Sequence, residues 1–161
     1  MSYITQLAPP TITTLNLEYA DLEEREWRDF FRAHLEVRSI NCTGSYDGVS
    51  RSLWDALSPA EEGNAPILCP RLETVYITLF KGISFTPLAD CLRNRRNSGF
   101  KLGHLKVMEW ERLVDVDTEG LRLPEVFSPL VESFESNIRS RSGQWMSSVR
   151  SPVRIYEPGV Y

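Results

Sequence analysis

The chain has 161 residues, of which 42% are hydrophobic and 25% are charged, and its net charge is −4. This length suits one domain with a sizeable core, and the composition excludes wholesale disorder, collagen and a small disulfide-framed scaffold. A nucleic-acid-binding surface is normally basic, so the mild acidity predicts that nucleic acid is not a partner.

Neither a membrane segment nor a secretion signal is expected. No apolar run reaches the roughly 18 residues that a membrane span needs, and the first residues lack the basic and apolar regions of a signal peptide. The three cysteines, Cys42, Cys69 and Cys91, are odd in number and irregularly spaced, which argues against a disulfide framework. These features predict a reducing compartment, either cytoplasmic or nuclear, and no membrane partner.

A pattern of the form apolar-x-x-apolar-x-apolar occurs four times along the chain. The copies begin at Ile12, Val37, Leu72 and Leu102. Each copy is predicted to be a short strand, because the last two apolar positions alternate with a polar one. Recurrence of the same internal spacing at intervals of about 25–35 residues indicates a repeat architecture.

The segments between these copies have a helical period. The first contains apolar or aromatic residues on one helical face, at Trp27, Phe30, Phe31 and His34. A shorter helical face follows, at Val49, Leu53, Trp54 and Leu57. Together they predict a helix after the first strand and another after the second.

Two further helices are predicted toward the C-terminus. Thr86 and Pro87 are typical of an N-cap followed by proline at the first helical position, with a buried face at Leu88, Cys91 and Leu92. The last helical stripe consists of Phe127, Leu130, Val131, Phe134 and Ile138. That helix is expected to begin at Ser128-Pro129 or, alternatively, at Pro124.

A short strand needs a crossover to run parallel beside its neighbour, and the helices supply it. The predicted fold class is therefore α/β, in the form of a curved solenoid of repeated strand, turn and helix units. About four parallel strands line its concave side, and the helices cover its convex side. The alternative is an ordinary doubly wound α/β domain. Residues 1–139 are assigned to the repeat domain, and residues 140–161 to a C-terminal tail that is either partly disordered or folded over the open end.

The repeat segments resemble the irregular leucine-rich repeats of fungal, mushroom-type F-box proteins. The run LCPRLETVYI at residues 68–77 carries the closest similarity, and residues 85–92 and 102–107 resemble the next helix and strand of that family. The resemblance covers about residues 10–135. It implies an intracellular protein–protein interaction module that recognises substrates for a ubiquitin-ligase adaptor. The F-box module itself is not recognised in this chain, so we expect a fragment, a truncated gene product or a repeat-only relative.

Catalytic chemistry is not indicated. The motifs HExxH, CxxC, G-x-S-x-G and the P-loop are all missing from the sequence, so no enzymatic activity, cofactor or metal is predicted. Asp115, Asp117, Glu119 and Gly120 copy the first half of an EF-hand loop, but its twelfth position is Val126 instead of glutamate. Two alternatives stay open. One is a small enzymatic or ion-regulated protein that uses the Asp115–Glu119 loop, and the other is a degenerate gene product without a selected partner.

The densest basic cluster follows the third predicted helix. It consists of Arg93, Arg95, Arg96 and Lys101. We interpret it as the solvated end of that helix, where cations complement the helix dipole. The alternative is a patch for phosphate binding or nuclear import.

The predicted binding surface is the concave face of the strands. Side chains between the apolar positions point to this face and line up across a parallel stack. The candidate partner-binding residues are Asn16, Asn41, Thr74, Tyr76, Thr78, His104, Lys106 and Met108. Tyr76 is the expected anchor of an unidentified protein partner, and the basic neighbours favour an acidic or phosphorylated peptide. The alternative is a hydrated sheet face that binds no partner.

Overall fold

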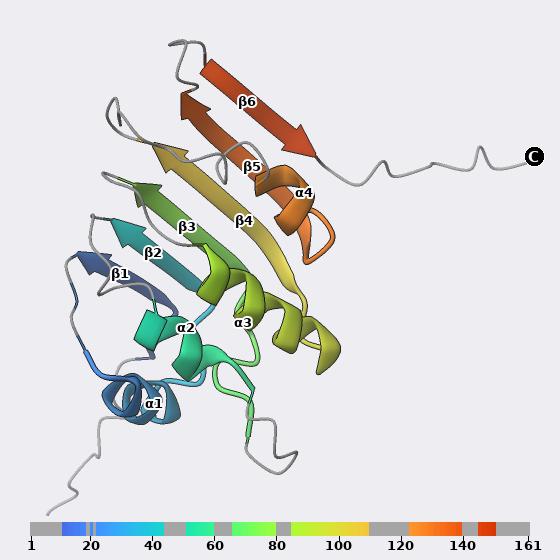
Figure 1. Cartoon of the computed structure of the whole chain (residues 1–161). Coiled ribbons are helices and arrows are strands. Elements are labelled where there is room, and N and C mark those ends of the chain that lie inside the picture. The colour runs from blue at the N-terminus through green and yellow to red at the C-terminus, as the bar shows by residue number, and fades with distance from the viewer. Residues whose placement is uncertain are drawn as a thin grey trace, which may run out of the picture.

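The computed structural model describes residues 11–18, 20, 22–43, 51–59, 66–79, 85–109, 123–139 and 145–150. Six strands form a single sheet in the order β1-β2-β3-β4-β5-β6 (Figure 1). The strands are β1 (Thr14–Glu18), β2 (Ser39–Thr43), β3 (Thr74–Leu79), β4 (Leu102–Glu109), β5 (Val131–Arg139) and β6 (Trp145–Arg150). The helices are α1 (Glu24–Ala33), α2 (Arg51–Leu57), α3 (Thr86–Asn97) and α4 (Leu123–Phe127).

The chain is an α/β protein built on a parallel sheet. Strands β1 to β5 are parallel to one another, and β6 pairs antiparallel with β5. The four helices lie on the same side of the sheet (Figure 1). Because each strand lies beside its neighbour in sequence, the order differs from that of a doubly wound sheet, in which it reverses.

The register of the first four strands confirms the predicted strand positions. Leu15 pairs with Ile40, Ile40 with Val75, and Val75 with Leu105. Ile40, Val75 and Leu105 are fully buried, whereas Leu15 is only partly buried because β1 is the outermost described strand. The spacing of apolar residues in the sequence therefore predicts which residues pair between β1 and β4.

The entries to the strands share one hydrogen-bond arrangement. The Thr13 carbonyl accepts from the N–H groups of Arg38 and Ser39, and the Arg38 carbonyl accepts from those of Glu73 and Thr74. The Glu73 carbonyl then accepts from His104 N–H at 2.9 Å. A Cβ on Gly103 would lie 3.0 Å from this carbonyl, so the close approach of the two strands favours glycine there.

Ion pairs also join equivalent positions of neighbouring repeats. Arg71 contacts Glu36 at 2.7 Å, and Arg38 contacts Glu73 at 3.1 Å. All four side chains are about half exposed, so each pair adds little stability. Their main effect is that opposite charges, and not like charges, meet where the second and third repeats stack.

The predicted helix over Phe127 to Ile138 is wrong. Helix α4 ends at Phe127, and β5 begins at Val131. Val131 pairs with Leu102 and Phe134 with Leu105, so this segment is a fifth copy of the strand pattern with a serine at its last apolar position. The three-residue interval that resembles one turn of a helix is the same interval that begins each of the four other copies of the pattern.

The other three predicted helices are present, and the start of α3 lies one residue before the position that the predicted N-cap at Thr86 implies. Trp27 and Phe31 form the buried face of α1, and Leu88, Cys91 and Leu92 contribute to that of α3. Helix α3 begins at Thr86, with Phe85 as its N-cap and proline in the first turn. Val49 of the second predicted helical face lies outside the described residues.

One basic residue contradicts its predicted exposure. Arg93, Arg96 and Lys101 are exposed as expected, but Arg95 is only 1% exposed. Arg95 points from the last turn of α3 into the core and donates to three backbone carbonyls, at Leu57, Leu68 and Cys69. Those carbonyls come from segments distant in sequence, which is why the local basic cluster could not reveal its burial.

The sheet continues beyond residue 139, where the repeat domain was expected to end, because β6 adds a strand to β5. None of the helices in the described ranges has the length and apolar character that a bilayer crossing requires. The Asp115–Glu119 loop lies outside the described residues.

Candidate functional site on the open sheet face

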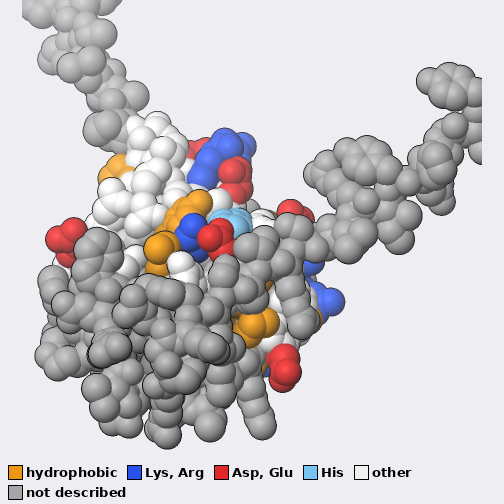
Figure 2. Space-filling view, turned by 90° about the horizontal axis from the view of Figure 1, so that it is seen from above, with side chains coloured by type: hydrophobic (Ala, Val, Ile, Leu, Met, Phe, Trp, Pro, Cys, Tyr) orange, Lys and Arg blue, Asp and Glu red, His pale blue; other side chains and the backbone are white. Residues whose placement is uncertain are grey.

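The two faces of the sheet differ in what covers them. Apolar side chains at alternate strand positions pack under the helices and form the core. The intervening side chains point to the opposite face, which no described helix covers and which we call the open face. Figure 2 shows hydrophobic, basic, acidic and histidine side chains lying close together on the side turned to the viewer.

The register aligns the open-face residues in three rows across β1 to β5. The first row is Thr14, Ser39, Thr74, His104 and Ser133. The second row is Asn16, Asn41, Tyr76, Lys106 and Glu135. The third row is Glu18, Thr43, Thr78, Met108 and Asn137. All eight candidate binding residues therefore lie on this one face.

Sequence reasoning missed the residues that β5 contributes. Ser133, Glu135 and Asn137 continue the three rows, and they were hidden because β5 was predicted to be a helix. The spacing Val131-x-x-Phe134 is the signal that could have found them, had one polar residue been allowed at the third position of the pattern.

On the open face, polar side chains of neighbouring strands contact one another between β1 and β2 and again between β4 and β5. Asn41 Nδ2 donates to Asn16 Oδ1 at 2.6 Å between β2 and β1. Between β4 and β5, His104 Nδ1 lies 2.6 Å from Ser133 Oγ, and Lys106 Nζ lies 2.8 Å from Glu135 Oε1. The Lys106 charge is thus compensated within the protein, which weakens the expected preference for an acidic or phosphorylated peptide.

Between these polar pairs, the open face exposes two large side chains with apolar surface. Tyr76 and Met108 are exposed by 37% and 36%, and the Tyr76 ring meets the His104 ring edge-on at 5.8 Å between centroids. Thr74 and Thr78 flank Tyr76 on the same strand. Two large side chains with apolar surface are therefore exposed beside the paired side chains of Lys106 and Glu135.

Covalent chemistry has little support among the described residues. Burial raises the pKa of Cys42, Cys69 and Cys91 to about 12, so these thiols stay protonated and unreactive at neutral pH. The part of the chain that the structure describes contains no group of three histidine, cysteine or acidic side chains placed to hold a metal ion.

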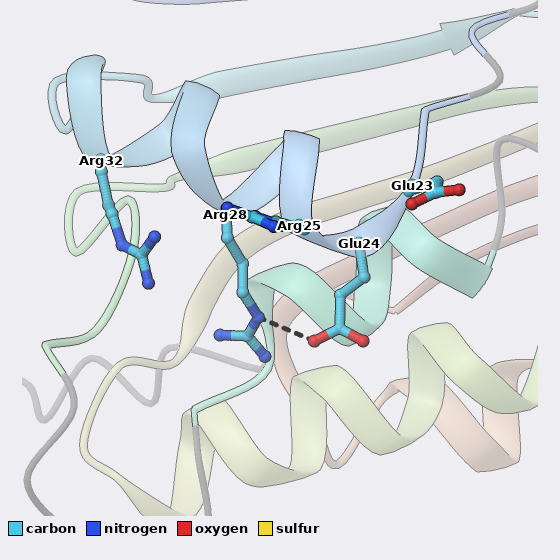
Figure 3. A pocket seen from close by; sticks show the side chains of 5 residues that line it. All are labelled: Glu23, Glu24, Arg25, Arg28 and Arg32. Atoms are coloured by element: carbon cyan, nitrogen blue, oxygen red, sulfur yellow. Dashed lines mark hydrogen bonds and ion pairs between the residues drawn. The ribbon is translucent and has the colours of Figure 1, made fainter.

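A hollow of about 550 Å³ lies on the outer surface of α1 (Figure 3). It is lined by Glu23, Glu24, Arg25, Arg28 and Arg32. Arg28 pairs with Glu24, and Arg32 pairs with Asp29, both at 2.7 Å. Since two of the three guanidinium groups already contact carboxylates and the hollow is open to solvent, we assign it no ligand.

The fold and this face together define an α/β protein with helices on one side of a parallel sheet and a mixed apolar and polar surface on the other. Comparison with protein-family models, with curated proteins and with solved structures found no match to this chain.

Proposed function

We propose that the chain is a non-enzymatic protein–protein interaction module, an irregular leucine-rich-repeat-like solenoid that binds a partner protein on its concave, open sheet face. The observation that carries this proposal is the pair of exposed side chains, Tyr76 and Met108, at the centre of that face. Tyrosine combines a large contact area with a polar tip and is enriched among residues that dominate binding energy. Methionine adapts its shape to varied apolar partners.

The chemistry of the face favours one kind of partner segment. Lys106 and Glu135 neutralise each other, and the asparagine pair Asn16 and Asn41 satisfies its own hydrogen bond. We therefore propose a neutral segment with an apolar side chain that packs between Tyr76 and Met108. The Thr74 and Thr78 hydroxyls on the same strand would bind its backbone or its polar side chains.

The resemblance to F-box repeat regions extends the proposal to a biological role. In that role the partner is a protein selected for ubiquitylation, and the chain acts as the substrate-recognition part of an adaptor in the cytoplasm or nucleus. The repeat pattern, with its shared strand entries and parallel register, supports this relationship.

The test is a selection from a random peptide library displayed on phage, with the 161-residue chain as the target. The selected peptides are synthesised, and their affinity is measured for the chain and for a Tyr76→Ala, Met108→Ala variant. The matched control is a Leu35→Ala, Val126→Ala variant, which truncates two side chains of similar exposure elsewhere on the molecule.

We expect the open-face variant to lose at least about tenfold in affinity, which corresponds to about 1.4 kcal/mol, and the control variant to bind as the unmodified chain does. The selected peptides should share an apolar residue and carry no excess of acidic residues. The open face would be ruled out as the binding site if the library yields no binder, or if the peptides lose the same affinity for the open-face variant and for the control variant.

A further inference from the structure

Among the described residues, most of the partly buried hydrophobic side chains that pack against the core lie at the β1 end of the sheet. Four of the partly buried hydrophobic side chains packed against the core belong to this end, namely Ile12, Leu15, Ala20 and Phe30. The residues that occupy the position of Leu15 in the next three strands are fully buried. The core is therefore only partly covered beyond β1.

The outer edge of β1 also presents backbone groups. Among the described residues, β1 pairs only with β2, and Ser39 N–H donates to the Thr13 carbonyl at 3.0 Å. Since successive residues of a strand direct their backbone groups to opposite sides, those of Thr14, Asn16 and Glu18 point away from β2. The strand contains no proline or lysine, the residues that commonly block pairing at an edge.

We propose that two copies of the chain associate by antiparallel pairing of their β1 strands about a two-fold axis at Asn16. In this register Asn16 faces Asn16 of the second copy, Leu15 faces Leu17, and Thr14 faces Glu18. The outward backbone groups of Thr14, Asn16 and Glu18 then form the hydrogen-bonded pairs of an antiparallel ladder. A second copy fits because the sequence of β1, TLNLE, has leucines at equal distances from Asn16 and places no like charges opposite each other.

The helices allow this arrangement to bury the exposed end of the core. An axis perpendicular to the sheet keeps the helices of both copies on the same side. Arg28 donates to the Asp55 carbonyl of α2 at 3.1 Å, and Phe30 lies about 200° further around α1. Phe30 therefore points away from α2, toward the second copy. On the side opposite the helices, the open faces of the two sheets form one continuous surface. Pairing of the β1 strands therefore leaves the open face exposed to a partner.

The test is sedimentation equilibrium of the 161-residue chain over a range of concentrations. We expect the apparent mass to rise with concentration toward twice that of the chain. Asn16→Lys places two like charges directly opposite each other and should raise the dissociation constant at least about tenfold. Asn41→Lys is the matched control, because it breaks the same side-chain hydrogen bond to Asn16 one strand away from the edge, and it should leave the dimer unchanged.

A mixture of two variants tests the register itself. Asn16→Lys and Asn16→Glu chains should each be weakened alone, but together they should form a heterodimer, because residue 16 of one copy contacts residue 16 of the other. A chain that stays monomeric at every concentration overturns the proposal, and so does a dimer that Asn16→Lys leaves intact. If a chain that starts at residue 11 dimerises while the full chain does not, residues 1–10 occupy this edge and the proposal is equally overturned.

Discussion

At the scale of single residues, Arg95 is the charged residue that is buried in the core of the described structure. Its guanidinium group is buried at the end of α3 and donates to the Leu57 carbonyl at 3.3 Å, to the Leu68 carbonyl at 2.8 Å and to the Cys69 carbonyl at 2.7 Å. Cys69 has a φ of 47°, a left-handed conformation that is unfavourable for a residue with a side chain. Arg95 thus joins Leu68 and Cys69, which lie just before β3, to the end of α2.

Replacing Arg95 with methionine should lower the free energy of unfolding by about 3 kcal/mol or more, because three carbonyls lose a charged donor and stay buried. Chemical denaturation followed by circular dichroism measures this loss. Arg93→Met, two residues before Arg95 in the same helix but exposed, is the control and should change stability by no more than about 0.5 kcal/mol. Equal stability of the two variants would show that the Arg95 hydrogen bonds contribute nothing net.

The three buried thiols predict how stability depends on alkaline pH. Burial raises the pKa of Cys42, Cys69 and Cys91 from 9.0 to about 12. Below pH 9 the thiols are protonated in both the folded and the unfolded chain, so their contribution is constant. Above pH 9 the unfolded chain releases protons that the folded chain retains, and each thiol should reduce the free energy of unfolding by about 1.4 kcal/mol per pH unit up to about pH 12.

Denaturation curves at several pH values between 8 and 11 would measure this slope. The control is a Cys42→Ala, Cys69→Ala, Cys91→Ala variant, in which the slope should flatten over the same interval. A thiol-reactive dye should label the folded protein slowly and the unfolded protein rapidly. Rapid labelling of the folded chain at neutral pH would contradict the burial of these cysteines.

At the scale of elements, strands are predictable from the sequence only where the pattern is complete. Each of the first four strands overlaps a complete copy of the apolar pattern, and its position and register follow from that spacing. The fifth carries Ser136 at the last position, so Val131 and Phe134 resemble a helical pair when they are considered alone. The segment forms a strand because it pairs with the edge of β4, where Leu102 and Leu105 lie opposite these two residues.

Candidate site residues were predictable to the same extent. The eight open-face positions follow from the alternation of side chains along β1 to β4, while Ser133, Glu135 and Asn137 depend on β5. The pairing of Lys106 with Glu135 links two residues from different elements, and only the register reveals it. Burial of Arg95 similarly depends on carbonyls from the α2–β3 connection, which no local pattern contains.

The assignment of β5 can be tested through its core residue Phe134. Its ring stacks on that of Phe127 at 5.7 Å and it is only 1% exposed. Phe134→Ala should lower the free energy of unfolding by about 3–5 kcal/mol through lost contacts and a cavity. Val126→Ala, at a position exposed by 38%, should have little effect. A small loss for Phe134→Ala in denaturant titrations would contradict the packing of β5 against α4.

At the scale of the whole molecule, each strand contacts the next strand along the chain, as β1 contacts β2, and successive helices such as α1 and α2 contact each other. In the solenoid that we propose, stability is approximately a sum over repeats and the interfaces between them. The outer repeat at β1 has one described neighbour and a partly exposed Leu15, whereas β3 lies between two strands and its Val75 is fully buried. The β1 end should therefore open more readily than the middle.

Native-state hydrogen exchange measures this difference directly. In dilute solution, where association of two β1 edges is suppressed, the amide of Leu15 should exchange through an opening at least about 1 kcal/mol less costly than that of Val75. Val75→Ala, which truncates the central repeat, should lower the protection of β1, β3 and β4 together. Leu15→Ala should lower mainly that of β1, since the remaining repeats keep their interfaces. Identical protection of Leu15 and Val75 in the unmodified chain would mean that the protein opens as one cooperative unit, and the additive description of its repeats would then fail.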